Sequence, residues 1–235
     1  MKMFLSDLDG TLMTAAENRI AIRILDAISA VQAKRIPFAV ASGRAISELW
    51  RLFEPFKEKL LFAACDGALI FEGKKLIFEA PIQNIAQFNK EDTLLLQGKY
   101  ITYVKGQNAF VREMKLHYNG HAVEFRDANE IEEPIYKVVV FQPQFEAQGV
   151  NKVYADARIT EFTAKGIDKG SATAFLLRRY GVDEAEAMAF GDNTNDLPML
   201  RSVANSVAVQ NAKRAVQIVC KYITNDIAST IREHI

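Results

Sequence analysis

Short apolar runs alternate with longer segments of helical periodicity over the first third of the chain. Residues 3–6, 38–41 and 60–64 are largely apolar without polar alternation, which is typical of parallel strands covered on both faces. Residues 18–35 and 45–53 carry apolar side chains at helical spacing, and a proline follows each segment. This strand–helix order predicts a parallel sheet with right-handed crossovers.

The middle of the chain breaks this alternation. Residues 68–80 predict a β-hairpin that turns at residues 72–75. Residues 81–157 mix strand-like and helical segments between glycine-containing turns, and this pattern favours an antiparallel α+β insertion. Within the insertion we expect strands over 93–98, 100–104 and 136–141 and a helix over 108–118.

The first pattern returns after the insertion. We expect helices over 169–180, 196–203 and 212–219 and strands over 187–190, 207–210 and 222–224. The chain is therefore predicted to be of the α/β class, with a Rossmann-like parallel sheet that has helices on both faces. Residues 1–80 and 158–235 would form this discontinuous core, and residues 81–157 would form a cap.

Composition narrows the choice of partners. The 235 residues include 29 Lys and Arg and 29 Asp and Glu, so the formal net charge is zero and no long-range field recruits nucleic acid or an anionic membrane. No segment is apolar enough to span a bilayer, and the charged pattern at Asp7 argues against a signal peptide. Cys65 and Cys220 are far apart and are expected to be reduced thiols, although one long-range disulfide is the alternative. We expect a cytoplasmic monomer or small homo-oligomer that binds neither nucleic acid nor membrane.

Four polar clusters lie at or near the predicted carboxyl ends of the parallel strands, where ligands bind in open α/β sheets. Each cluster alone also fits a structural role, such as a turn at Asp9 or a helix start at Asp196. Together, however, they gather three carboxylates that repel one another unless a cation joins them, and Mg²⁺ prefers oxygen ligands. A lysine and a hydroxyl nearby would suit a phosphoryl group. The clusters are Asp7-Leu8-Asp9-Gly10-Thr11, Ser42-Gly43-Arg44, Lys169, and Gly191-Asp192 with Asn195-Asp196.

These clusters resemble the four motifs of the haloacid dehalogenase superfamily of phosphohydrolases. The matching stretches are DLDGTL at 7–12, ASGR at 41–44, GIDKG at 166–170 and GDNTND at 191–196, in the same order and at similar separations. The insertion between the second and third motifs resembles that of the Cof-type branch, which has an α/β cap. Many Cof-type sequences have Asn-Gly-Ala after the third strand, whereas this chain has Asp66-Gly67-Ala68, which bears on substrate preference.

The resemblance implies a role for each motif residue. Asp7 would be the nucleophile that forms an aspartyl-phosphate, and Asp9 would be the general acid and base. Mg²⁺ would be bound by Asp7, Asp192 and the backbone carbonyl of Asp9, and Asp196 would hold the loop behind this site. The residues implied in phosphate binding are Thr11, Ser42, Gly43, Arg44, Lys169 and Asn195.

The implied reaction is Mg²⁺-dependent hydrolysis of small phosphate monoesters, with sugar phosphates as the expected class of metabolite. Two alternatives remain open at the level of sequence. One is a phosphotransferase or phosphomutase that uses the same aspartyl-phosphate, and the other is a non-catalytic sugar-phosphate sensor. Turnover to free phosphate would distinguish hydrolysis from both.

Overall fold

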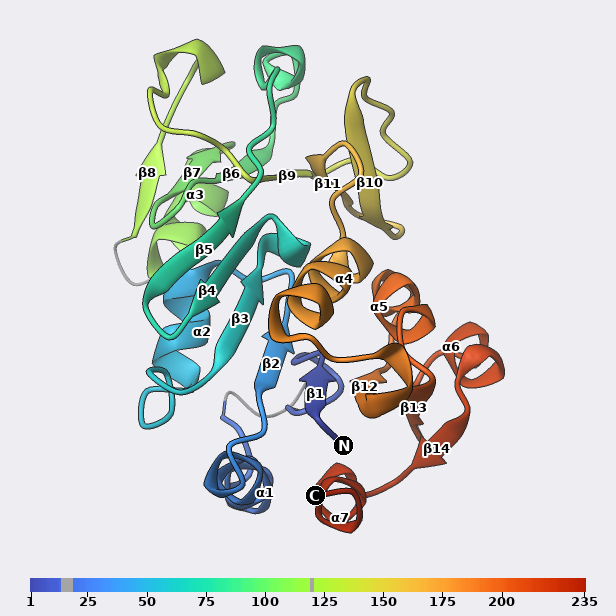
Figure 1. The fold of residues 1–235 in the computed structure, drawn as a ribbon. Helices are drawn as coiled ribbons and strands as arrows, with labels where there is room; N and C mark the ends of the chain where they lie inside the picture. Colours follow the sequence, from blue (N-terminus) through green and yellow to red (C-terminus); the bar gives the residue numbers. More distant parts are fainter. Residues whose placement is uncertain (14–18, 119–120) are drawn as a thin grey trace.

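The computed structural model describes residues 1–13, 19–118 and 121–235 and divides them between two sheets (Figure 1). The larger sheet has eight strands, in the order β14-β13-β12-β1-β2-β3-β4-β5. The strands from β14 to β3 run parallel, and β4 and β5 form the predicted antiparallel hairpin at one edge. The bounds are β1 Met3–Ser6, β2 Phe38–Ala41, β3 Leu61–Ala64, β4 Leu69–Glu72, β5 Lys75–Glu79, β12 Ala187–Gly191, β13 Asn205–Val209 and β14 Tyr222–Thr224.

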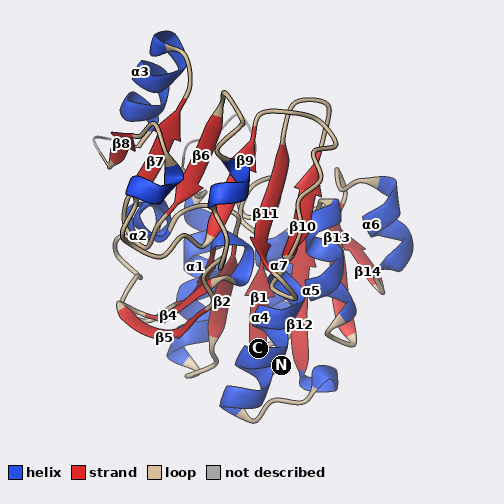
Figure 2. Cartoon of the chain, turned by 90° about the horizontal axis from the view of Figure 1, so that it is seen from above, coloured by secondary structure: helices blue, strands red, loops and turns tan. Residues whose placement is uncertain are grey.

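Helices cover both faces of this sheet, so the predicted α/β core is confirmed (Figures 1 and 2). Helices α1 and α7 pack against each other on one face, and α4 and α5 pack against each other on the other. The bounds are α1 Ile22–Ala33, α2 Ile46–Leu52, α4 Lys169–Tyr180, α5 Leu197–Arg201, α6 Arg214–Val219 and α7 Ile227–Glu233. Short 3-10 turns are η1 Cys65–Gly67, η2 Ala86–Phe88, η3 Ala128–Glu130, η4 Glu184–Glu186 and η5 Thr194–Asp196.

Some helices are shorter than the apolar periodicity predicts. The helix expected from residue 18, which lies outside the described residues, begins only at Ile22, because Ala21 is extended while Ile20 is still buried. The helix expected over 196–203 is divided into the turn η5 and α5, and the one expected over 212–219 begins at 214. Apolar side chains thus continue into loops that the core buries, where periodicity no longer reports backbone conformation.

The second sheet belongs to the insertion and stands over the core in Figure 1. Its strand order is β10-β11-β9-β6-β7-β8, and neighbours are antiparallel except for the parallel pair β7–β8. Helix α3, Asn108–His117, packs on β7 and β8. The bounds are β6 Leu94–Gln97, β7 Thr102–Lys105, β8 Ala122–Glu124, β9 Lys137–Val140, β10 Val150–Ala155 and β11 Thr160–Ala164.

The extent of the cap differs from the sequence expectation. The predicted boundary between residues 157 and 158 lies in the turn between β10 and β11, and β11 pairs with β9 of the insertion. We therefore propose that the cap covers residues 81–164. Strands β8, β10 and β11 were not expected, because they lack the unbroken apolar runs of the other strands.

Strands β6 and β9 of the cap sheet are buried on both faces, which explains their apolar runs. Leu94 and Leu96 of β6 join one apolar cluster, whereas Leu95 between them joins a second cluster with Val139 and residues of α3. Successive side chains of a strand point to opposite faces. The three leucines therefore pack into two apolar clusters, one on each face of the sheet. The part of the second face that α3 does not cover lies over the carboxyl ends of the core strands.

Candidate active site

Asp7 follows the last residue of β1, at the centre of the core sheet. Its backbone N–H donates to the carbonyl of Phe190 in β12 at 2.9 Å, so the neighbouring strand holds the peptide. The residue is only 5% exposed, and one carboxylate oxygen contacts Lys169 Nζ at 2.5 Å. Burial raises the pKa of Asp7 well above its usual value, although the charge of Lys169 opposes this effect. The site therefore favours a cation beside Asp7.

Lys169 connects this nucleophile candidate to the loop after β12. It is the first residue of α4, where the side chain of Asp168 accepts the N–H of Ser171 in a capping box. Its Nζ contacts Asp7 Oδ1 at 2.5 Å and Asp196 Oδ1 at 2.6 Å. Burial by itself lowers the pKa of Lys169, but the carboxylates of Asp196 and Asp7 outweigh it and raise that pKa. The lysine is consequently charged.

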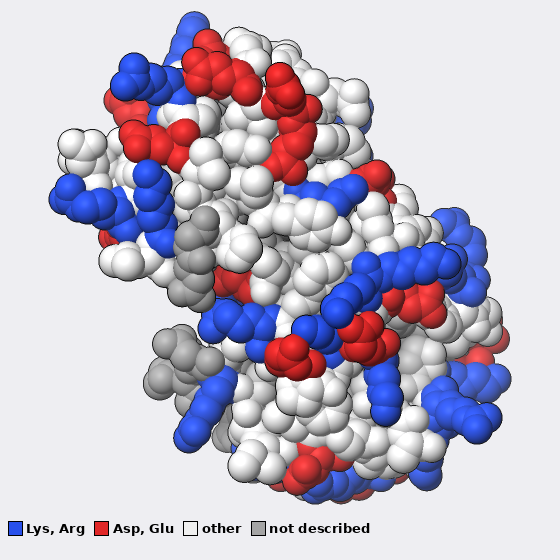
Figure 3. Space-filling view, turned by 90° about the vertical axis from the view of Figure 1, so that its left-hand side faces the viewer, with Lys and Arg blue, Asp and Glu red and all other residues white. Residues whose placement is uncertain are grey.

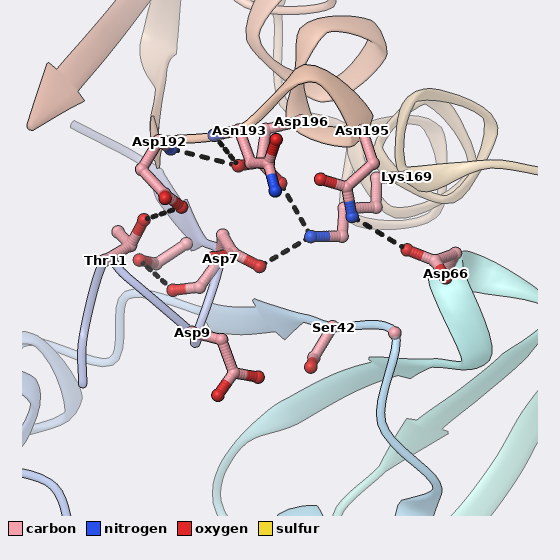
Figure 4. A network of polar contacts seen from close by, with 12 residues as sticks. Asp7, Asp9, Thr11, Ser42, Asp66, Lys169, Asp192, Asn193, Asn195 and Asp196 are labelled. Carbon is pink, nitrogen blue, oxygen red and sulfur yellow. Dashed lines mark hydrogen bonds and ion pairs between the residues drawn. The ribbon is translucent and has the colours of Figure 1, made fainter. Parts of the chain in front are cut away.

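The loop after β12 is organised by Asp196. Its Oδ2 accepts the backbone N–H groups of Asp192 at 3.0 Å and Asn193 at 2.9 Å (Figure 4). The hydroxyl of Thr11 donates to Asp192 Oδ1 at 3.1 Å, so the first and last motifs meet directly. Gly10 allows this contact, since its φ is +89° and a Cβ at that position would lie 2.4 Å from Asp192 Oδ2.

The acidic residues of these loops fit a divalent cation. Asp7, Asp192 and Asp196 each offer an oxygen within 4.8 Å of the others. Burial and the charge of Asp196 raise the pKa of Asp192, which is the response expected where like charges gather. Both oxygens of Asp196 already have partners within the protein. Asp7 and Asp192 are therefore the side chains that could hold Mg²⁺, and the carboxylate of Asp9 is not part of this group.

Asp9 instead points away from Asp7 (Figure 4). Its carboxylate pairs with Arg44. Arg44 donates from Nε to Asp9 Oδ2 at 2.8 Å and from Nη2 to Oδ1 at 2.7 Å, while Nη1 contacts Glu48 at 3.2 Å. These bonds, first of all those to Asp9, raise the pKa of Arg44. Arg44, which the resemblance implies in phosphate binding, is thus paired with the carboxylates of Asp9 and Glu48. The Asp9 side chain remains 48% exposed.

A cavity of about 490 Å³ separates this edge of the core from the cap. Most of the expected site residues line this cavity, but Thr11, Asp192 and Asp196 do not. The hydroxyl of Thr11 donates its hydrogen bond to Asp192 instead. Ser42 is 1% exposed and its Oγ accepts the N–H of Arg44 at 3.2 Å. The expected site residues on the wall of the cavity are Asp7, Asp9, Ser42, Gly43, Arg44, Lys169 and Asn195.

Sequence reasoning missed the charged residues that the cap contributes. Lys137 of β9 is 3% exposed at its side chain, and its Nζ contacts Asp66 Oδ2 at 2.7 Å, Glu161 Oε2 at 2.8 Å and the carbonyl of Gly43 at 3.0 Å. We call Lys137, Asp66 and Glu161 the cap–core triad. The lysine at the start of the otherwise apolar strand KVVV was the signal that could have identified Lys137 as a buried charged residue.

Asp66, the departure from the usual Asn, lies in the core half of this triad. Burial alone raises the pKa of Asp66, but the charges of Lys137 and Lys169 and a bond from Lys137 lower it overall. Its other oxygen accepts a hydrogen bond from Asn195 Nδ2 at 3.3 Å. The unusual residue therefore links the cap to a residue implied in phosphate binding.

The chain is similar to known hydrolases in sequence and in fold. A model of the haloacid dehalogenase-like hydrolases matches residues 4–230. The chain is 24% identical over 246 residues to the 5-amino-6-(5-phospho-D-ribitylamino)uracil phosphatase YbjI of Escherichia coli, covering 94% of this chain and 90% of that protein. In fold it resembles a crystal structure from Eubacterium rectale, with a TM-score of 0.88, 24% identity and coverage of 100% and 99%. It also resembles the HAD subclass IIB sugar phosphatase BT4131, with a TM-score of 0.81, 23% identity and coverage of 99% and 98%.

The chain belongs to the haloacid dehalogenase-like hydrolases. The prediction of a Cof-type phosphatase of this superfamily is confirmed by the family match together with the phosphatase relatives. Both cysteines are free thiols, as expected. Among residues 1–13, 19–118 and 121–235, no helix has the length and apolar character needed to cross a membrane. Lys, Arg, Asp and Glu lie interspersed on the face seen in Figure 3, in keeping with the balanced charge.

Proposed function

We propose that this protein hydrolyses small phosphate monoesters with Mg²⁺, through an aspartyl-phosphate on Asp7. The observation that carries the proposal is the setting of Asp7, which lines the cavity while Lys169 occupies one of its oxygens. Its other oxygen would attack phosphorus. The attack would form the bond from Asp7 to phosphorus and break the bond to the ester oxygen of the leaving alcohol.

The chain's own residues would supply the proton transfers and the charge balance. Asp9 would protonate the leaving alkoxide and then take a proton from the water that releases phosphate from Asp7. Ser42, Lys169 and Asn195 on the cavity wall would hold the phosphoryl oxygens. When bound by Asp7, Asp192 and the Asp9 carbonyl, Mg²⁺ would offset the repulsion between the carboxylate and the phosphoryl group.

One feature of the geometry sets a requirement on this mechanism. Asp9 accepts two hydrogen bonds from Arg44, and a carboxylate in this arrangement is not a proton donor. The pair with Arg44 would have to open before Asp9 reaches the leaving oxygen. A substrate phosphate that draws Arg44 towards itself would have this effect. Arg44 would then pair with Asp9 before the substrate binds and with the phosphate afterwards.

Small phosphorylated metabolites are the proposed substrates, and sugar phosphates are the expected class. The relative from Escherichia coli is named for a substrate that joins a phosphorylated ribityl chain to uracil, and BT4131 is described as a sugar phosphatase. A cavity of about 490 Å³ beneath the cap suits a metabolite better than a folded phosphoprotein. We further propose action in the cytoplasm as a monomer or small homo-oligomer, without nucleic acid or membrane partners.

The test is phosphate release from a panel of phosphorylated sugars, nucleotides and cofactors with Mg²⁺ present. We expect Asp7→Asn to abolish release while circular dichroism remains unchanged, and we expect EDTA to stop the native enzyme and added Mg²⁺ to restore it. Release by Asp7→Asn at the native rate would contradict the nucleophile, and full activity in EDTA would contradict the metal. Transfer of phosphate to an added sugar, with little free phosphate, would favour a phosphotransferase instead. Binding of a sugar phosphate without turnover would favour a sensor.

A further inference from the structure

The cap sheet presents an ordered set of side chains to the cavity. Leu95, Val139 and Glu161 lie opposite one another on β6, β9 and β11, so their side chains share one face. In the next row towards the core, Gln97 lies opposite Lys137. All five residues line the cavity. The cap therefore offers a polar row beside the phosphate-binding motifs and a mainly apolar row beyond it.

The apolar row is part of a larger apolar wall. Ile159 and Phe141 line the same cavity as Leu95 and Val139, and Tyr118 adds an aromatic ring at the end of α3. Leu95 and Val139 are each 5% exposed. A hydroxyl group pressed against such a wall loses water and gains no partner, which costs free energy. The wall consequently favours an apolar surface over the hydroxyl-covered surface of a sugar.

Glu161 adds one directed polar group to this wall. Lys137 holds its Oε2 at 2.8 Å, so the carboxylate is fixed in position. Among the described residues no hydrogen bond reaches Oε1, and the side chain is 16% exposed where it meets the cavity. An anchored carboxylate oxygen of this kind accepts a hydrogen bond from a ligand N–H or O–H.

We propose that Leu95, Val139, Ile159 and Glu161 form a subsite for the leaving group of the substrate. The subsite takes a phosphate monoester whose alcohol carries a flat, largely apolar ring with one N–H or O–H donor at its edge. The ring lies on the apolar wall, and the donor binds Glu161 Oε1. This inference rests on the proposed phosphatase function, and among small phosphate monoesters it favours those of alcohols with a flat apolar ring over sugar phosphates.

The first test compares three esters with Mg²⁺: 3-hydroxybenzyl phosphate, benzyl phosphate and ribose 5-phosphate. We expect kcat/KM to be highest for 3-hydroxybenzyl phosphate and lowest for ribose 5-phosphate, with about tenfold between these two. A preference for ribose 5-phosphate would overturn the subsite and leave the phosphatase function standing. If no ester of the wider panel releases phosphate, the proposed function fails and the subsite fails with it.

The second test uses paired variants of β9. Val139→Thr places a hydroxyl in the wall, whereas Val140→Thr places one on the opposite face of the same strand, in the other apolar cluster. We expect Val139→Thr to reduce the preference for benzyl phosphate over ribose 5-phosphate about fivefold and Val140→Thr to leave that preference unchanged. Equal preferences in the two variants would overturn the apolar wall as a subsite. Thermal unfolding of both variants measures their stability separately.

The third test addresses the donor. Glu161→Gln keeps the shape of the side chain but removes the charge, so the preference for 3-hydroxybenzyl phosphate over benzyl phosphate should fall about fivefold. KM for 3-hydroxybenzyl phosphate should carry this change, because the donor contacts Glu161 and not the reacting atoms. A preference that stays at the native ratio would overturn the assignment of Glu161.

Discussion

Replacement of Lys137 by methionine should destabilise the protein strongly. The ammonium group lies between Asp66 and Glu161 at 2.7 and 2.8 Å, and its side chain is 3% exposed. Lys137→Met keeps much of the volume but leaves two carboxylates buried without their cation. Removal of one partner from a buried ion pair costs about 3–5 kcal/mol. Since domains are stable by only about 5–15 kcal/mol, this is a large share of the free energy of unfolding.

The measurement is urea unfolding followed by circular dichroism at pH 7. Lys152→Met is a suitable control, because Lys152 belongs to the same cap sheet and pairs with Glu146 at a largely exposed site. An exposed pair contributes only about 0–1 kcal/mol, so the control should resemble the native protein. The triple change Lys137→Met, Asp66→Asn and Glu161→Gln removes all charges of the triad, and we expect it to recover much of the loss.

The pH dependence provides an independent check on the cause. In the native protein the pKa of Asp66 is lowered, so its contribution to stability is present above the unfolded pKa and is lost as pH falls through the folded pKa. In Lys137→Met, burial without a cation raises the pKa values of both carboxylates, so folding takes up protons. The gap in unfolding free energy between native and variant should therefore shrink from pH 7 to pH 5. A loss below about 1 kcal/mol at pH 7, or a gap that widens on acidification, would refute the buried cap–core triad.

Three further predictions concern the core. Asp9→Asn should slow turnover and increase the phosphoenzyme recovered after acid quenching, because it cannot transfer protons; a native rate would remove its role. Gly10→Ala should weaken Mg²⁺ activation, measured as the Mg²⁺ concentration at half-maximal rate, since its Cβ would lie 2.4 Å from Asp192 Oδ2 at a φ of +89°; an unchanged value would contradict the contact. At pH 8 a thiol reagent should label Cys220 and not Cys65 in the native protein, and both after denaturation, because burial raises the pKa of Cys65 to about 12. Rapid labelling of both thiols in the folded protein would contradict this burial.

The core was predictable because its signals are local. Strands β1, β2 and β12 are buried on both faces, so each is visible as an apolar run, and a polar motif lies at the carboxyl end of each. The hairpin of β4 and β5 likewise has its turn within the sequence that forms it. Strand β10, by contrast, is half-exposed and irregular, with a register shift between Lys152 and Tyr154. Its place depends on pairing with β11, which no local pattern specifies.

The candidate site divides in the same way. Asp7, Asp192 and Lys169 come together because parallel strands and a capped helix place their ends at one edge of the sheet. The partners of Arg44 were not predictable, because a guanidinium beside a phosphate motif can bind either the substrate or a neighbouring carboxylate, and the positions of Asp9 and Glu48 decide between them.

The sequence by itself determined the class of enzyme and which residues are proposed for its phosphate chemistry, because each motif adjoins a buried strand or helix start whose pattern is local. The tertiary structure alone decided which cap residues reach the cavity. Lys137 and Asp66 are 71 positions apart and meet only through the register of β9 in one sheet and the turn after β3 in another. The same register turns Leu95, Val139 and Glu161 towards the cavity, and a shift of one residue would turn them away.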